Sequence, residues 1–417
     1  MDQYSTVDSL NTCPEEEISR FAADLSDGLG KVRTKFVKDM LVGIHQSRSV
    51  NLTEVARSLK EEIELHASHK RLSRNLARSE LIDVIGDRLL AMGAAQVTNN
   101  TLLIVHCYNL VKRFATKMEY LCDDESEGTG FSSYQVCEIV AFNPLYPDRY
   151  VPLTMHLWSR GDPHYESDEI EVRSTIRRVE QATEGRGTFY LRPKRDVQTN
   201  SQAEDQLLQF LLRESDSALV TSVIEEGQFI ADGQLRSATD LIETTELPFG
   251  KMMFKYVPPG YLDEKLAMEL AMFVQFGTRC ITLTESKVPV TLVVTEYKQQ
   301  ESSVLREHGA TLMAFLVNGH ITDRDAVWPL IRDFHRVVDV IDVEQNHRAD
   351  FNLSDFRVLT YDRLRLLTTL LEAVMYYETV ITRQVRIDIP RITQDPHKGN
   401  HIRDFLLPPD TELAESA

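Results

Sequence analysis

The sequence predicts an α/β protein built around one β-sheet, and three observations favour this fold class. The four residues from Leu102 to Val105 form a continuous apolar run rich in β-branched side chains, which is typical of a strand buried on both faces. Segments with strand-type and helix-type patterns then follow one another along the chain. A region with helical periodicity precedes the first strand, so a separate helical domain is expected there.

Three short helices are expected between residues 31 and 78. The first has an apolar face made by Val37, Leu41 and Ile44. The second begins at Asn51, a suitable N-terminal cap ahead of Glu54, and its apolar stripe is Leu52, Val55, Leu59 and Ile63. In the third, cationic residues recur every four positions opposite two leucines: Lys70, Arg74 and Arg78 opposite Leu72 and Leu76.

The next elements suit a ribonuclease-H-like core. After a helix at 81–90 and the strand at 102–105, strands are predicted at 134–142 and 151–158, a helix at 168–182 and a strand at 188–191. This βββαβ order is typical of a fold in which antiparallel strands join a parallel extension. The first strand is expected to end at His106-Cys107, where it would open into a cleft.

The second half of the chain changes pattern before it returns to the core. Short β-type runs predict a β-rich insertion, at 218–224, 252–257, 279–283 and 290–297. A strand at 313–317, a helix at 325–342 and a long apolar helix at 361–382 then complete the core. The expected domains are an acidic, partly ordered N-terminus (1–30), a helical DNA-binding domain (31–98), the core (99–217 and 311–384), the insertion (218–310) and a tail (385–417).

Composition favours an ordinary globular protein inside the cell. Of 417 residues, 42% are hydrophobic and 26% charged, and no apolar run approaches the roughly 18 residues that a membrane span needs. The acidic N-terminus does not have the pattern of a signal peptide, so a cytoplasmic protein without membrane contact is expected. Five widely spaced cysteines without a CxxC pair predict free, buried thiols: Cys13, Cys107, Cys122, Cys137 and Cys280.

The charge is unevenly distributed. The net charge of −18 argues against nucleic-acid binding, but residues 31–78 hold eleven basic and five acidic side chains, a local excess of six positive charges. A helix that buries leucines and exposes cations can contact phosphates, although the same pattern also occurs on solvated helix faces. The residues expected to contact DNA are Lys31, Arg33, Lys35, Lys38, Arg48, Lys70, Arg71, Arg74 and Arg78.

Several segments carry a family resemblance. The block Asp355 to Arg365 reads DFRVLTYDRLR, and the strand at 102–105 is followed by a run that contains Lys112, Ala115, Lys117 and Met118. A basic segment, Lys70-Arg71-Leu72 and then Arg74, precedes the core, while Val151-Pro152-Leu153 and Trp158-Ser159 lie on the third strand. Between about residues 29 and 377 the chain resembles the DDE-type insertion-sequence transposases. The resemblance implies a ribonuclease-H-like fold, double-stranded DNA as partner and a homodimer.

The resemblance also implies where the catalytic carboxylates should lie, and none is present. The three positions correspond to His106, Leu191 and Ile341, and no Asp or Glu occurs between Asp87 and Glu119. On the last helix, counting back from the 355–365 block places Phe334, Val337, Ile341 and Arg348 at the aromatic, arginine, glutamate and lysine positions of the family. Hard divalent ions need oxygen ligands, so these side chains cannot hold the metal pair that cuts DNA.

Three functions therefore follow as hypotheses. The first is a catalytically inactive, DNA-binding protein of transposase descent, acting as a regulator, competitor or nucleoprotein component, nucleoid-associated in a prokaryote, with no metal or other cofactor. The second is an active transposase that uses Mg²⁺ or Mn²⁺ through carboxylates at other positions, such as Asp342 or Glu138. The third is a protein-interaction scaffold without DNA binding, favoured by the net charge of −24 outside residues 31–78.

Overall fold

The computed structural model describes residues 14–112, 117–123, 132–144, 149–192, 211–212, 219–222, 227–257, 268–284, 286–299, 311–383 and 391–393. Its helices are α1 (Pro14–Leu25), α2 (Lys31–Ser47), α3 (Leu52–Ser58), α4 (Leu65–Leu76), α5 (Glu80–Ala94), α6 (Asp168–Thr183), α8 (Ala238–Thr244), α9 (Arg324–Ala349) and α10 (Tyr361–Tyr376), with a 3-10 turn η2 (Leu353–Asp355) and a π-helical turn η3 (Tyr377–Ile381). None of the helices in these ranges is long and apolar enough to cross a membrane.

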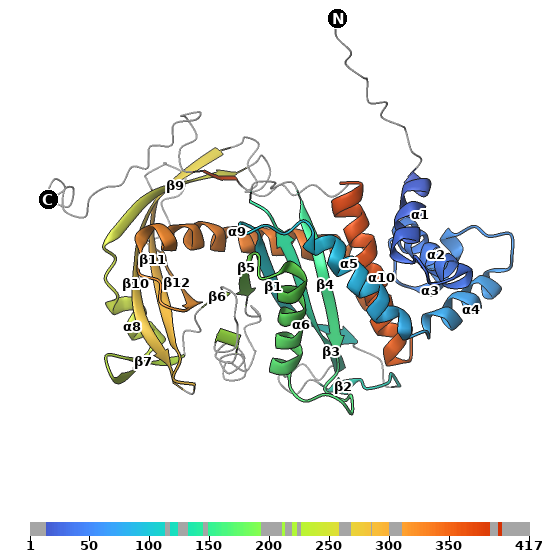
Figure 1. Ribbon diagram of the computed structural model, residues 1–417, viewed down its shortest axis with the longest axis horizontal. Helices are drawn as coiled ribbons and strands as arrows, with labels where there is room; N and C mark the ends of the chain where they lie inside the picture. Colours follow the sequence, from blue (N-terminus) through green and yellow to red (C-terminus); the bar gives the residue numbers. More distant parts are fainter. Residues whose placement is uncertain are drawn as a thin grey trace, which may run out of the picture.

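The strands belong to one large mixed sheet. They are β1 (Leu102–Lys112), β2 (Cys122–Asp123), β3 (Ser132–Phe142), β4 (Tyr150–Trp158), β5 (Thr188–Arg192), β6 (Leu219–Ser222), β7 (Gln228–Ala231), β8 (Gln234–Ser237), β9 (Phe249–Val257), β10 (Met268–Leu283), β11 (Pro289–Gln299), β12 (Thr311–Asn318) and β13 (Arg391–Thr393). The α/β class predicted from the sequence is confirmed. Figure 1 shows α1–α4 at one end of the molecule, β9–β12 at the other, and β1, β3 and β4 between them.

The sheet order places the central strands next to one another. Starting at the β4 edge, the order is β4-β3-β1-β5-β6, and the sheet continues through β12, β11, β10 and β9 to β13. Strands β1, β5 and β6 are parallel, whereas β3 runs antiparallel to both β1 and β4. The apolar run predicted to be a doubly buried strand is the first part of β1, and all four of its side chains are buried.

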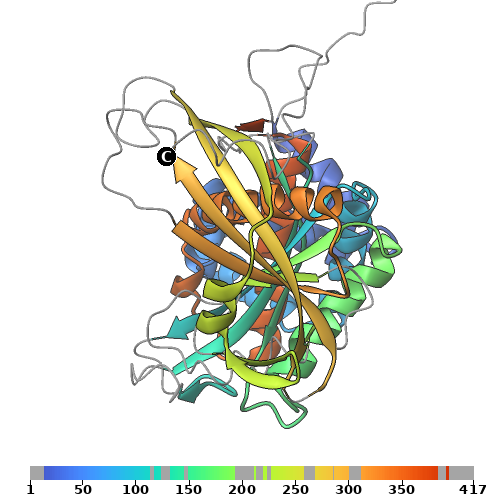
Figure 2. The same cartoon turned by 90° about the vertical axis from the view of Figure 1, so that its left-hand side faces the viewer.

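The β-rich region at 218–310 extends this sheet. Strand β6 pairs with β5 in parallel, and β12 pairs with β6 in antiparallel orientation, so the same sheet runs through both parts of the molecule. Figure 2 views the long, curved strands β9–β11 from their own end of the molecule. The sequence pattern did not predict β7, β8, α8 or β13.

The N-terminal helices refine what the sequence predicted. Residues 1–30 were expected to be partly ordered, and in their described part α1 begins at Pro14 and buries Ile18, Phe21, Ala22 and Leu25. Asn51 caps α3 as predicted, since its side chain accepts a hydrogen bond from the Thr53 backbone N–H. The helix is shorter than predicted, because it ends at Ser58 and Lys60 has φ +47°, which leaves Ile63 exposed.

The faces of the central strands are covered by different helices. Helices α9 and α10 lie on the face that carries His106 and Glu138, where α9 contacts His106 and α10 contacts the Met155 backbone. Helix α6 covers the opposite face, where Glu171 lies 2.8 Å from the His156 imidazole. Successive side chains of a strand point to opposite faces of the sheet, so the position of a residue along β1 or β3 decides whether it faces α9 and α10 or α6.

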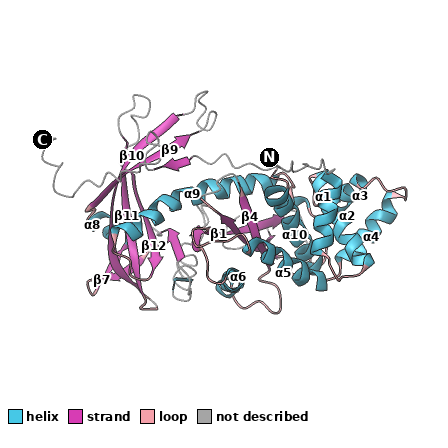
Figure 3. Cartoon of the chain, turned by 45° about the horizontal axis from the view of Figure 1, so that its top comes forward, coloured by secondary structure: helices cyan, strands magenta, loops and turns pink. Residues whose placement is uncertain are grey.

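Helix α9 joins the two parts of the sheet. It is 26 residues long, and Asp323 caps it by accepting a hydrogen bond from the Ala326 N–H. Phe334 stacks on Phe315 of β12 with ring centroids 4.9 Å apart, and Gln345 near the other end reaches β1. Figures 1 and 3 show α9 running along the sheet from β10–β12 towards β1. The predicted helix at 325–342 was too short by two turns at its C-terminal end.

Candidate functional site

The site begins with His106, which lies in the middle of a strand. The prediction that β1 ends at His106-Cys107 was wrong, because the backbone continues to pair with β3 as far as Lys112. Residues 106–112 are half-buried apart from buried Leu110, so they do not continue the apolar run of 102–105 although they form a ladder with β3. In this register His106 lies directly opposite Glu138, so both side chains point to the α9 face.

Four side chains meet where α9 crosses β1 and β3, and we call His106, Glu138, Glu344 and Arg348 the β1–α9 cluster. The Arg348 guanidinium forms an ion pair with Glu138 Oε2 and lies 3.4 Å from Glu344 Oε1. The same guanidinium lies over the Tyr108 ring, 3.8 Å from its centroid. His106 Nε2 is 3.2 Å from the Gln345 side-chain nitrogen, so the amide donates to the imidazole.

Burial controls the charges of this cluster. Glu138 and Glu344 are 3% and 2% exposed, and burial, followed by the nearby Glu138 carboxylate, raises the pKa of Glu344 well above its usual value. Burial opposes the charge of Arg348, but Tyr108, Glu138 and Glu344 together raise the pKa of the guanidinium. Burial thus favours the neutral form of Glu344, while the groups around Arg348 favour its positive charge.

The cluster also contains the one group of metal-ligating residues found in the described ranges. Ligand atoms of His106, Glu138 and Glu344 lie within 4.8 Å of one another. One imidazole and two carboxylates suit a first-row divalent ion such as Mn²⁺ or Zn²⁺. Oε1 of Glu138 and Oε1 of Glu344 are buried without a hydrogen-bond partner, which leaves each with lone pairs for an ion. Against this, Arg348 already places a positive charge beside both carboxylates.

The predicted triad positions are only partly brought together. Leu191 is buried in β5 beside Val105, and Ile341 is buried on α9, so neither offers a ligand. Asp342 is exposed and does not belong to the cluster, whereas Glu138, named with it as an alternative carboxylate, does. Residues 193–195, which follow Leu191 and Arg192, lie outside the described residues.

Glu344 was not predicted as a site residue, although the helix spacing contains a signal for it. Ile341, Glu344 and Arg348 are separated by three and four positions, so they share one face of α9. The resemblance to the transposase family placed the catalytic glutamate position at Ile341. The acid that lies next to His106 in the structure is Glu344, about one helical turn later. The contact between this turn of α9 and β1 joins residues far apart in the sequence, so no local sequence pattern predicts it.

A second buried network connects α9 to the N-terminal helices. Glu378 in η3 lies 2.5 Å from His45 Nδ1 and 2.6 Å from Arg48 Nη1, both on or next to α2, and 2.9 Å from His347 Nε2. Burial opposes its charge, but hydrogen bonds from His347, His45 and Arg48 lower the pKa of Glu378 to about 2. His347 Nδ1 is in turn 2.6 Å from the Tyr150 hydroxyl oxygen.

The cations expected to contact DNA fall into two groups. Five are held in internal ion pairs: Arg33 and Arg78 with Glu80, Lys35 and Arg71 with both Asp39 and Glu61, and Arg48 with Glu378. The other four are exposed and make no ion pair within the part of the chain that the structure describes: Lys31, Lys38, Lys70 and Arg74. Only this second group has its full charge available to a phosphate.

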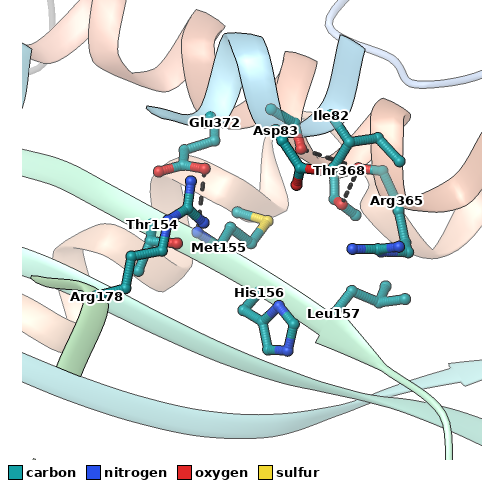
Figure 4. Close-up of a pocket in the computed structure, with 12 residues that line it drawn as sticks. Ile82, Asp83, Thr154, Met155, His156, Leu157, Arg178, Arg365, Thr368 and Glu372 are labelled. Atoms are coloured by element: carbon teal, nitrogen blue, oxygen red, sulfur yellow. Dashed lines mark hydrogen bonds between the residues drawn. The ribbon is translucent and has the colours of Figure 1, made fainter. Parts of the chain in front are cut away.

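A third feature is a small polar pocket of about 40 Å³ beside α10, drawn in Figure 4. Glu372 lines it and accepts a hydrogen bond from the Met155 backbone N–H at 3.0 Å, while its Oε1 atom is buried without a hydrogen-bond partner. Burial, followed by the charge of Glu138, raises the pKa of Glu372 to about 8. Arg178 points towards this carboxyl group in Figure 4, but it pairs with Asp87 at 2.6 Å.

Comparisons with protein-family models and with curated proteins find no match for this chain.

Replacing Arg348 by Met tests whether the guanidinium holds the β1–α9 cluster together. Methionine keeps an unbranched chain over Tyr108 but leaves Glu138 buried without its cation, so we expect a loss of about 3–5 kcal/mol in unfolding free energy at pH 7. Protonation of the carboxyl groups should reduce this loss at pH 5. Urea unfolding at both pH values measures it, with the exposed Arg357→Met variant as control. Equal losses at the two pH values would contradict the assignment.

Glu372 should make the stability depend on pH. Its folded-state pKa of about 8 lies above the value of 4.5 of an unperturbed glutamate, so the folded state binds more protons and stability should fall as the pH rises from about 4.5 to 8. Glu372→Gln keeps an acceptor for the Met155 N–H and should flatten this slope in urea unfolding, making the variant the more stable protein at pH 8. The exposed Glu243→Gln variant should keep the wild-type slope. A wild-type slope in Glu372→Gln would overturn the assignment.

Proposed function

We propose that this chain is a DNA-binding protein of transposase descent, with a ribonuclease-H-like core that no longer performs two-metal catalysis. The observation that carries the proposal is the strand order β4-β3-β1-β5-β6, in which β3 alone is reversed and α6 connects β4 to β5. A βββαβ unit with two parallel strands added beside the first is the arrangement expected of that core. Helix α9, which follows the β-rich region, then crosses β1 where the last catalytic helix would lie.

Loss of catalysis is supported by the side chains around this crossing. Two of the three carboxylate positions are filled by Leu191 and Ile341, both buried in the apolar core. At the third, His106 and its neighbours Glu138 and Glu344 surround Arg348, so a guanidinium lies close to where the metal pair would bind. Two divalent ions need several oxygen ligands and no competing cation, and this cluster meets neither condition.

DNA binding is proposed to reside in the helical domain. The four exposed cations lie on α2 and α4, and Leu72 and Leu76 of α4 are fully buried on the opposite side of that helix. The internal ion pairs of Arg71 and Lys35 with Asp39 and Glu61 fix α4 against α2, so they present Lys70 and Arg74 on a rigid surface. Contacts of this kind are electrostatic and bind duplex DNA without requiring a metal.

Charge reversal on α4 tests the DNA-binding proposal. The double variant Lys70→Glu and Arg74→Glu should weaken binding to duplex DNA, and the slope of log K against log salt should become shallower by about one for each phosphate that the protein no longer neutralises. Fluorescence anisotropy across a salt series, with and without Mg²⁺, measures both. Lys287→Glu changes an exposed cation between β10 and β11, strands that lie at the other end of the molecule in Figure 1, and this variant should bind like the wild type. If the double variant also bound normally, the scaffold hypothesis would replace this proposal.

A second candidate function rests on the His106–Glu138–Glu344 group itself. If Arg348 moves aside, these ligands could hold a single Mn²⁺ ion and support metal-dependent DNA nicking. A supercoiled-plasmid assay in Mg²⁺ and Mn²⁺ distinguishes this function from the first. Nicking that Glu344→Gln abolishes, but the exposed Asp342→Asn variant retains, would establish it. We expect no nicking by the wild type in either metal.

A further inference from the structure

Two thiols face each other across the central strands, on the opposite side of the sheet from the β1–α9 cluster. Cys107 of β1 and Cys137 of β3 are direct partners in the antiparallel register. Both are free thiols, as the sequence predicted for the cysteines. The prediction that they would be buried holds for Cys137 but not for half-buried Cys107 and Cys122 or for exposed Cys280; Cys13 lies outside the described residues.

The register gives this pair the geometry of a disulfide. Directly opposed residues of antiparallel strands have Cα atoms about 4.5–5.5 Å apart, and a disulfide needs about 4.4–6.8 Å. Because the two residues are already directly opposed, closing the bond requires side-chain rotation and no change of register. The other described thiols have no such partner, since Cys122 faces Ser133 and Cys280 faces Thr291.

The two thiols differ in a way that gives each a role. Cys107 is half-buried, whereas Cys137 is fully buried. The neighbouring Cys107 side chain, followed by burial, raises the pKa of Cys137 well above its usual value, so this thiol must lose its proton as it attacks. An oxidant arriving from solvent therefore meets Cys107 first, with Cys137 directly behind it.

We propose that Cys107 and Cys137 form a peroxide-sensitive modification site that closes as a cross-strand disulfide. Hydrogen peroxide transfers one oxygen atom to the Cys107 sulfur, which becomes a sulfenic acid, and the rest of the peroxide leaves as water. The Cys137 sulfur then attacks the Cys107 sulfur, and the hydroxyl group departs with the Cys137 proton as a second water. In total two thiols lose two electrons, and one peroxide is reduced to two waters.

Formation of the disulfide would affect the neighbouring β1–α9 cluster. His106 and Glu138 are the adjacent residues on β1 and β3, and they are also register partners, so the disulfide would join the strands directly behind them. A covalent bond at this level restrains the strands that carry half of the β1–α9 cluster. Disulfide formation does not depend on DNA binding, because it needs only the strand register and the two thiols.

Mass spectrometry tests the proposal on the full-length protein. The reduced, denatured chain should take five maleimide labels, and after treatment with hydrogen peroxide it should take three and be two hydrogen atoms lighter before labelling. Trypsin leaves Cys122 and Cys137 in one peptide, so chymotrypsin is added to cleave after Tyr134 between them. The expected product is a linked peptide pair that contains Cys107 and Cys137 and disappears on reduction.

Two variants make the assignment specific. Cys137→Ser removes the resolving thiol, so Cys107 should accumulate as a sulfenic acid that dimedone labels, and no linked pair should form. Cys280→Ser removes the exposed thiol on β10 and should leave the Cys107–Cys137 product unchanged. The proposal is overturned if the linked pair contains another cysteine, or if peroxide converts Cys107 to a sulfinic acid while Cys137 of the wild type remains a thiol.

Discussion

The ion pair between Arg348 and Glu138 is the constraint on which the centre of this structure depends. Taking a guanidinium and two carboxyl groups out of water is unfavourable, and the contact compensates only when the partners are held in close geometry. That geometry requires α9 to cross β1 and β3 at one particular turn, with Glu344 and Arg348 pointing at the sheet. The apolar contacts of α9 with β12, such as Phe334 on Phe315, would tolerate small shifts of the helix, whereas the buried ion pair would not.

The same turn of α9 also connects the sheet with the N-terminal helices. His347 is adjacent to Arg348, and its two ring nitrogens contact Tyr150 of β4 and Glu378 of η3. Glu378 in turn binds His45 and Arg48, so one buried carboxylate ties the helical domain to the last turn of the α10 segment. The π-helical geometry of η3 adds an extra residue to that turn, a local distortion that is frequent at functional positions. The two networks thus meet in consecutive residues of one helix.

Local periodicity predicted most helices and strands of the central sheet region, but not the residues at which they begin and end. The buried run at 102–105 and the leucine face of α4 follow from residue pattern alone, because burial on a strand or helix face imposes a period of two or about 3.6. Helix α1 was not predicted because Glu15, Glu16 and Glu17 make the segment acidic, although the helix has a short apolar face. The end of β1 was placed too early because residues 106–112 mix polar and apolar side chains and do not continue the apolar run of 102–105. The partnership of His106, Glu138 and Glu344 joins three elements far apart in the chain, and no window of sequence contains it. Strands β6, β9, β10 and β11 of the β-rich region were recognised, but their place in the same sheet depends on the long-range pairing of β6 with β12.

The number of basic residues in a segment differs from the number of cations that the folded protein exposes. A segment with six excess positive charges suggests a broad cationic surface, yet Arg71, Lys35 and Arg48 have their charges directed at carboxylates of the same protein. The same applies to the site, where Arg348 matches a cation of the family pattern but contacts Glu138 and Glu344 within the protein. A cation that is paired inside the protein makes the structure more rigid, whereas an exposed cation such as Lys70 adds positive electrostatic potential at the surface. The exposed cationic surface is therefore smaller than the composition implies, and its position depends on the ion pairs that hold α2 and α4 together.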